Sequence, residues 1–173
     1  METDLLYSTL SYTLPALVTG MTAAFVIKKF LDNSDKRAIL DLKKSSQKEM
    51  LPIKLQAFER MTLFLERIDP SKLLVRVSPT STDKHQYREY LIASIQQEYE
   101  HNLVQQIYIS DQCWGLILTA KNSIIKLIKD TCSESNVMDA GQLREKILTN
   151  TIKEPAASIS ALRYIKTEVR GLF

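Results

Sequence analysis

The chain has 173 residues and a net charge of +3, with 45% hydrophobic and 25% charged residues. This length is typical of one domain, or of a small domain with an additional segment, and the content of four Gly and five Pro residues favours helices over strands. The positive charge is concentrated in residues 28–48, where seven Lys and Arg residues outnumber three Asp residues. Nucleic-acid-binding domains more often carry a basic face across the whole fold, so we expect no nucleic-acid partner.

An uncharged stretch from Leu5 to Ile27 comes first, and Lys28 and Lys29 end it. The hydrocarbon core of a bilayer requires roughly 20 helical residues, so we predict a transmembrane anchor within residues 1–30. A cleaved signal peptide is one alternative, although the acidic start and the lack of a small-residue cleavage site disfavour it. A helix packed on the protein's own bundle is the other alternative.

Small residues recur every four positions in this stretch, at Ala16, Gly20 and Ala24. Such a ladder lets two helix backbones approach closely. It predicts a helix-packing face and therefore a homodimer or a partner helix. The alternative is that Gly and Ala are simply common in helices of this kind.

A basic connector is predicted for residues 31–50, with an interruption of the helix at Asn33 and Ser34. Positive charges follow the apolar stretch and none precedes it, so the positive-inside rule places the N-terminus outside and residues 51–173 in the cytoplasm. The basic residues that follow the apolar stretch form a cluster. This cluster either attracts anionic lipid or serves only to set the orientation of the chain in the membrane. Its members are Lys28, Lys29, Lys36, Arg37, Lys43 and Lys44.

Residues 51–173 show amphipathic helical patterns separated by short polar segments. Asp69 and Pro70 fit the N-cap and first position of a helix, and Asp111 and Asp139 are expected to be further N-caps. The fold class predicted is therefore all-α, with the N-terminal transmembrane helix followed by a compact four- to five-helix bundle. The helices are expected at about 52–68, 84–103, 112–132, 139–152 and 155–170, with a short apolar segment at 72–77.

The expected helix 112–132 illustrates how the core is assigned. Its inner face is predicted to include Trp114, Ile117, Ile124 and Ile128, which follow the period of a helix. Three lysines are expected outside. They are Lys121, Lys126 and Lys129.

No set of residues in this sequence indicates catalysis or metal binding. His85 and His101 are roughly 24 Å apart on one helix, so they cannot share a metal ion. Cys113 has no His near it in sequence, and Cys132 is roughly 28 Å away along the same helix, too far for a disulfide. We therefore predict no catalytic residue, no cofactor and no enzymatic activity. Reduced thiols at Cys113 and Cys132 would fit a reducing compartment.

Two stretches resemble a known family: 13–17 with 25–30 (TLPAL and FVIKKF), and 52–60 with 64–70 (PIKLQAFER and FLERIDP). They resemble an uncharacterised family of short bacterial proteins with one N-terminal membrane segment and a helical cytoplasmic domain. The resemblance implies a single-pass protein of the bacterial inner membrane but supplies no catalytic residues. The function expected is a membrane-tethered module, with the bilayer and an unidentified protein as partners, that scaffolds or docks proteins. The alternatives are an enzyme or small-ligand sensor with a site between helices, and a soluble helical protein.

Overall fold

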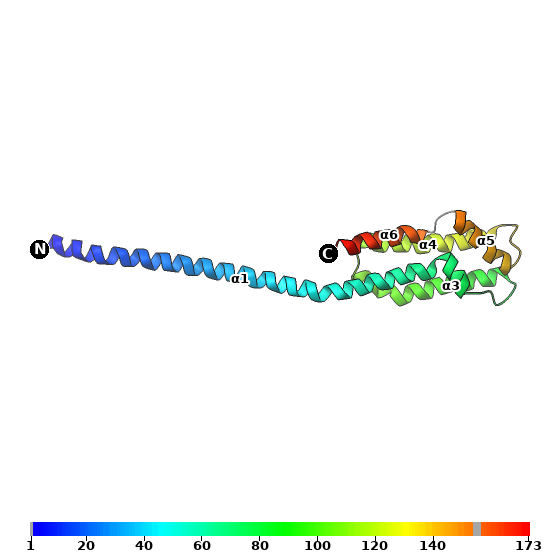
Figure 1. Cartoon of the computed structure of the whole chain (residues 1–173), viewed down its shortest axis with the longest axis horizontal. Coiled ribbons are helices and arrows are strands. Elements are labelled where there is room, and N and C mark those ends of the chain that lie inside the picture. Colours follow the sequence, from blue (N-terminus) through cyan, green and yellow to red (C-terminus); the bar gives the residue numbers. More distant parts are fainter. Residues whose placement is uncertain (1, 154–156) are drawn as a thin grey trace. The chain divides into compact units, whose positions relative to one another are not determined.

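A computed structural model describes the backbone of residues 2–153 and 157–173, and the side chains of these residues except 2–14, 16, 31–39 and 153. All regular structure in the described residues is helical (Figure 1). The chain divides into two units, Met1–Glu49 and Met50–Phe173. The first helix, α1 (Glu2–Ile68), supplies residues to both units.

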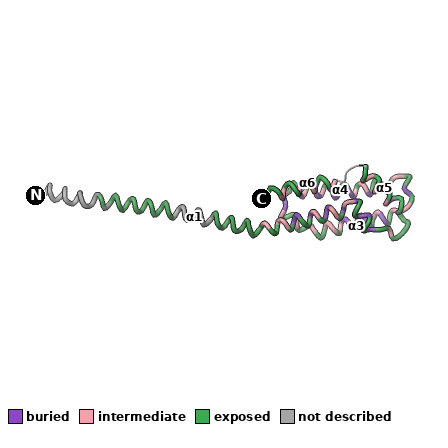
Figure 2. The backbone as a smooth tube through the Cα atoms, in the orientation of Figure 1, coloured by how far each residue is buried: buried purple, intermediate pink, exposed green. Residues whose placement is uncertain are grey.

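In the first unit, the backbone of α1 is helical throughout, so the predicted interruption at Asn33 and Ser34 is wrong. The described side chains of residues 17–30 and 40–49 are all exposed (Figure 2, green). Hydrogen bonds from Thr19 to the Pro15 carbonyl and from Thr22 to the Val18 carbonyl satisfy these hydroxyls within the helix. These two hydroxyls therefore need no partner from another helix.

The predicted transmembrane helix Leu5–Ile27 is wrong. In the part of the chain that the structure describes, no helix is both long enough and apolar enough to cross a membrane. The fold class is corrected to an all-α chain with a helical bundle. The cellular location of the chain stays a prediction.

The second unit is the bundle, which confirms that part of the predicted fold. Helix α4 packs against α3, α5 and α6, and α5 also contacts α2 and α3 (Figure 1). The last part of α1 adds buried residues such as Phe58, Phe64 and Leu65 to the common core (Figure 2, purple). The remaining helices are α2 (Pro70–Arg76), α3 (Lys84–Asn102), the 3-10 helix η1 (Leu103–Ile107), α4 (Asp111–Ser133), α5 (Ala140–Lys153) and α6 (Ala157–Arg170).

Side-chain caps fix where several of these helices begin. Asp69 accepts a hydrogen bond from the Ser71 amide at 3.1 Å, and Pro70 is the first residue of α2, as predicted. The prediction for α4 is wrong by one residue, because Ser110 is its N-cap and accepts from the Cys113 amide at 3.1 Å. Asp111 is instead the first helical residue, where the helix dipole favours a negative charge.

Candidate functional site

An open groove between the last part of α1 and α6 has a volume of about 490 Å³. Its floor includes Phe58 and Ile165, which are each 3% exposed. Its walls are the half-buried Leu55, Thr62 and Val169. All of these residues belong to the bundle unit, so the groove is an apolar surface that the bundle leaves partly uncovered.

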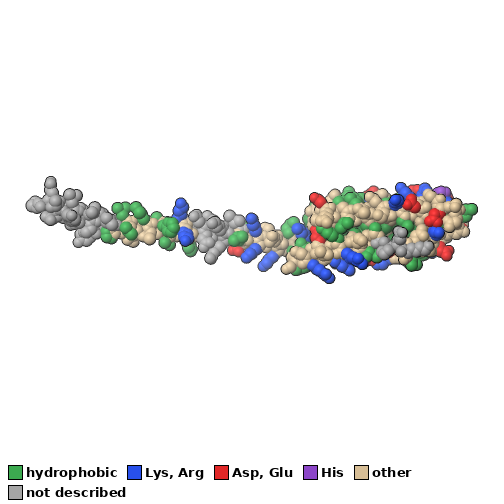
Figure 3. Space-filling view, turned by 90° about the horizontal axis from the view of Figure 1, so that it is seen from above, with side chains coloured by type: hydrophobic (Ala, Val, Ile, Leu, Met, Phe, Trp, Pro, Cys, Tyr) green, Lys and Arg blue, Asp and Glu red, His purple; other side chains and the backbone are tan. Residues whose placement is uncertain are grey.

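Charged side chains form the rim of this groove. Glu59 lies on the α1 side, and Lys166 and Arg170 lie on the α6 side, and all three are exposed. Arg163 is also exposed, and its spacing of three and seven residues from the other two cations places all three on one edge of α6. In the space-filling view, Lys and Arg side chains gather along an edge of the bundle (Figure 3).

Glu168, the acidic residue of α6, is held away from the rim. Its carboxylate accepts hydrogen bonds from the Ser110 amide at 3.2 Å and from the Ser110 hydroxyl at 2.9 Å. Burial, followed by the nearby negative charge of Glu168, raises the pKa of the Cys113 thiol to about 12. Cys113 is therefore a protonated core residue and is not suited to nucleophilic chemistry.

An aromatic cluster forms where α1, α3 and α4 meet. The Tyr99 ring lies with its centroid 5.7 Å from that of Trp114 and 6.2 Å from that of Phe64. Lys121 is 9% exposed, and its Nζ is 3.9 Å from the centroid of the Tyr99 ring. An aromatic face attracts a cation, and the aliphatic part of a lysine packs well in apolar surroundings.

The prediction that Lys121 lies outside the bundle is wrong. Lys121 follows Ile117 by four residues and precedes Ile124 by three, which places it in the inner stripe of α4. This spacing was visible in the sequence, but the charge of lysine suggested an exposed position. Lys126 and Lys129 are exposed as predicted.

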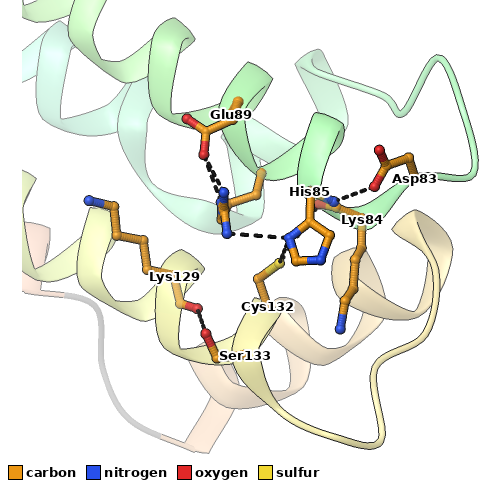
Figure 4. Close-up of polar contacts among 8 residues, drawn as sticks. Asp83, Lys84, His85, Glu89, Lys129, Cys132 and Ser133 are labelled. Atoms are coloured by element: carbon orange, nitrogen blue, oxygen red, sulfur yellow. Dashed lines mark hydrogen bonds and ion pairs between the residues drawn. The ribbon is translucent and has the colours of Figure 1, made fainter.

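A second polar cluster joins the start of α3 to the end of α4 (Figure 4). The Cys132 Sγ lies 3.9 Å from Nδ1 of His85, and an Arg88 guanidinium nitrogen lies 3.4 Å from the same imidazole nitrogen. Arg88 also pairs with Glu89 at 2.5 Å, and this hydrogen bond raises the pKa of the guanidinium. The sequence could not reveal the contact between His85 and Cys132, because it depends on the pairing of α3 with α4.

A thiol beside an imidazole occurs in cysteine nucleophiles, but the surroundings of Cys132 do not favour that role. The residue is 1% exposed. It lies in the last turn of α4, where its sulfur contacts the start of α3 at Lys84 and His85. Among the described residues, no group of three potential ligands is placed to hold a metal ion.

Those residues of the two sites predicted in the first unit whose side chains the structure describes are exposed on α1. Gly20 and Ala24 are exposed, and a Cβ built on Gly20 meets no heavy atom within 4 Å. Lys28, Lys29, Lys43 and Lys44 are exposed as well. The side chains of Ala16, Lys36 and Arg37 lie outside the described residues. The helix-packing face and the lipid-binding cluster both stay predictions.

Together, the fold and these sites define an all-α bundle protein that presents an apolar groove with a basic edge. The chain belongs to a family of unknown function, DUF7935, whose model matches residues 4–172. This match confirms the predicted resemblance to an uncharacterised family, whereas a bacterial source stays a prediction. No curated protein and no solved structure matches the chain.

Proposed function

We propose that this chain is a protein-docking module that binds a helical segment of another protein in the groove between α1 and α6. The observation that supports this function is the groove itself, with buried Phe58 and Ile165 below half-buried Leu55 and Val169. An amphipathic helix that lays its apolar face into such a groove is a recurrent mode of peptide recognition. The affinity then comes from apolar area removed from water on both partners.

The dimensions of the groove suit a few side chains of a docked helix. From Leu55 to Thr62 the helix rises by roughly 10 Å, which corresponds to two turns. Two turns of a partner helix present apolar side chains at positions i, i+3, i+4 and i+7. A small apolar ligand is the second candidate, because a volume of about 490 Å³ is within the usual range for ligand pockets.

The proposal is tested by NMR on the isotope-labelled full chain, titrated with a synthetic amphipathic peptide that carries Leu at helical spacing. We expect the largest amide shifts near Phe58, Thr62 and Val169. Replacement Val169→Glu introduces a charge into the wall and should abolish the shifts. The matched control Ile159→Glu changes another apolar residue of α6, which is 40% exposed outside the groove, and should leave them intact. Equal effects of the two variants would contradict the proposal.

A further inference from the structure

We infer that the partner of the groove is an amphipathic helix with acidic residues along one flank, an inference that rests on the docking function proposed above. The observation behind it is the unequal charge of the two walls. The α6 wall presents Lys166 and Arg170, whereas the α1 side of the rim presents Glu59. Arg163 lies about one turn before Lys166 on the same edge of α6.

The three cations of α6 are available to a partner. All three are exposed, and in the described part of the chain none of them forms an ion pair. Glu168, which shares their helix, is instead bonded to Ser110. Among the described residues of the bundle, none forms an ion pair that offsets the positive charge of this wall.

A docked helix that enters the groove brings its flanks close to both walls. Carboxylates on the flank next to α6 would lie opposite Arg163, Lys166 and Arg170, and like charges there would repel. On the other flank, Glu59 favours neutral or basic residues. This asymmetry also fixes the direction of the bound helix, because a reversed helix would exchange its flanks.

The strength of this preference follows from the exposure of the rim. Exposed charge pairs contribute little individually, and at physiological salt charges more than ~8 Å apart are largely screened. Three such pairs together predict a preference of roughly tenfold for the acidic flank over the basic one. The preference should shrink as the salt concentration rises.

The experiment compares two synthetic peptides that share the same Leu positions and differ only in one flank, which carries Glu in one peptide and Lys in the other. Binding to the full chain is measured by fluorescence anisotropy at low and high salt. We expect the Glu peptide to bind about tenfold more tightly, and the double variant Lys166→Glu, Arg170→Glu to prefer the Lys peptide. The matched control Lys126→Glu, Lys129→Glu, which changes exposed lysines of α4, should retain the original preference.

The outcomes separate this inference from the docking function. Equal binding of both peptides in the groove would overturn the acidic-partner inference and leave docking intact. Binding of neither peptide would overturn both. Binding of dodecanoate, a simple anionic amphiphile, in place of either peptide would also overturn both and would indicate a small-ligand groove instead.

Discussion

Two regions of the chain place the same kinds of side chain in opposite surroundings. In residues 17–30 the large apolar side chains are 57–73% exposed, whereas those in the core of the bundle are at most 8% exposed. Both regions are helical. The comparison shows that local hydrogen bonding is enough to define a helix here, and that burial depends on which neighbours the helix acquires.

The arrangement of apolar residues explains the difference. Between residues 57 and 68, the buried side chains recur at three- and four-residue spacing and form one stripe that faces the other helices. Between residues 17 and 30, apolar side chains surround the helix, so one neighbouring helix cannot cover them all. The bundle's own helices therefore cover most of its apolar side chains, whereas the described apolar side chains of residues 17–30 are exposed.

The largest expected effect compares a leucine from each region. Leu65 is fully buried and Leu17 is 60% exposed. Replacement Leu65→Ala should lower the free energy of unfolding of the bundle by about 2–5 kcal/mol, because it leaves a cavity. Replacement Leu17→Ala should change it by less than about 0.5 kcal/mol. Urea unfolding of the full chain, followed by Trp114 fluorescence, measures both, and similar losses would show that segment 17–30 is packed after all.

A lysine from each region gives the next contrast. Lys121→Ala should destabilise the bundle by about 1–2 kcal/mol, because it removes the cation from the Tyr99 ring and the packed lysine stem. Lys28→Ala changes an exposed lysine and should have no measurable effect on the same transition. The fluorescence of Trp114 in the folded state should also change only in the Lys121 variant, since Trp114 stacks on Tyr99. If Lys121→Ala left the free energy of unfolding unchanged, this would indicate that Lys121 is solvated in the folded bundle.

A pH-dependent effect on stability is expected from the buried thiol of Cys113. The pKa of Cys113 is raised from 9.0 to about 12 in the folded state, so above about pH 9 the unfolded chain loses this proton first. The linkage relation then predicts that stability is fully present below that pH and falls above it, by at most ~1.4 kcal/mol per pH unit. Unfolding titrations should show a smaller slope for Cys113→Ala than for the wild-type chain. A wild-type slope in the Cys113 variant would rule out this contribution.

The smallest expected change in stability comes from a comparison of two exposed glycines, one in each region of the chain. A Cβ added at Gly115 or at Gly20 meets no heavy atom within 4 Å. Gly115→Ala should therefore stabilise the bundle by about 0.5–1 kcal/mol through improved helix propensity. Gly20→Ala should leave the unfolding of the bundle unchanged. If the ladder of Ala16, Gly20 and Ala24 packs closely against a second helix, Gly20→Ala would instead weaken self-association measured by analytical ultracentrifugation.

The sequence was most informative where the chain signals its own helix boundaries. Asp69 with Pro70 begins α2, and Asp139 accepts from the Gln142 amide at the start of α5. Helix periodicity also placed Ile117, Ile124 and Ile128 on the inner face of α4, and all three are buried. These predictions succeeded because caps and stripes depend on residues only a few positions apart.

The sequence misled where one residue type suggested a fixed environment. Lys121 was assigned to the surface because of its charge, although its spacing put it in the buried stripe. Similarly, the uncharged run Leu5–Ile27 suggested a membrane span because length was weighed above the hydroxyl residues within it. The lysine was assigned by its charge and the uncharged run by its length, and in neither case did the assignment rest on which residues surround the segment in the fold.

The sequence by itself determined that this chain is helical, where most of its helices begin, which faces of them are apolar and which family it belongs to. Only the tertiary structure decided that α1 and α6 leave a groove between them, that Lys121 meets Tyr99 and that Cys132 meets His85. The physical reason is the range of the interactions. Helix formation is governed by neighbours within about one turn, whereas the choice of partner helix depends on the packing of the whole core.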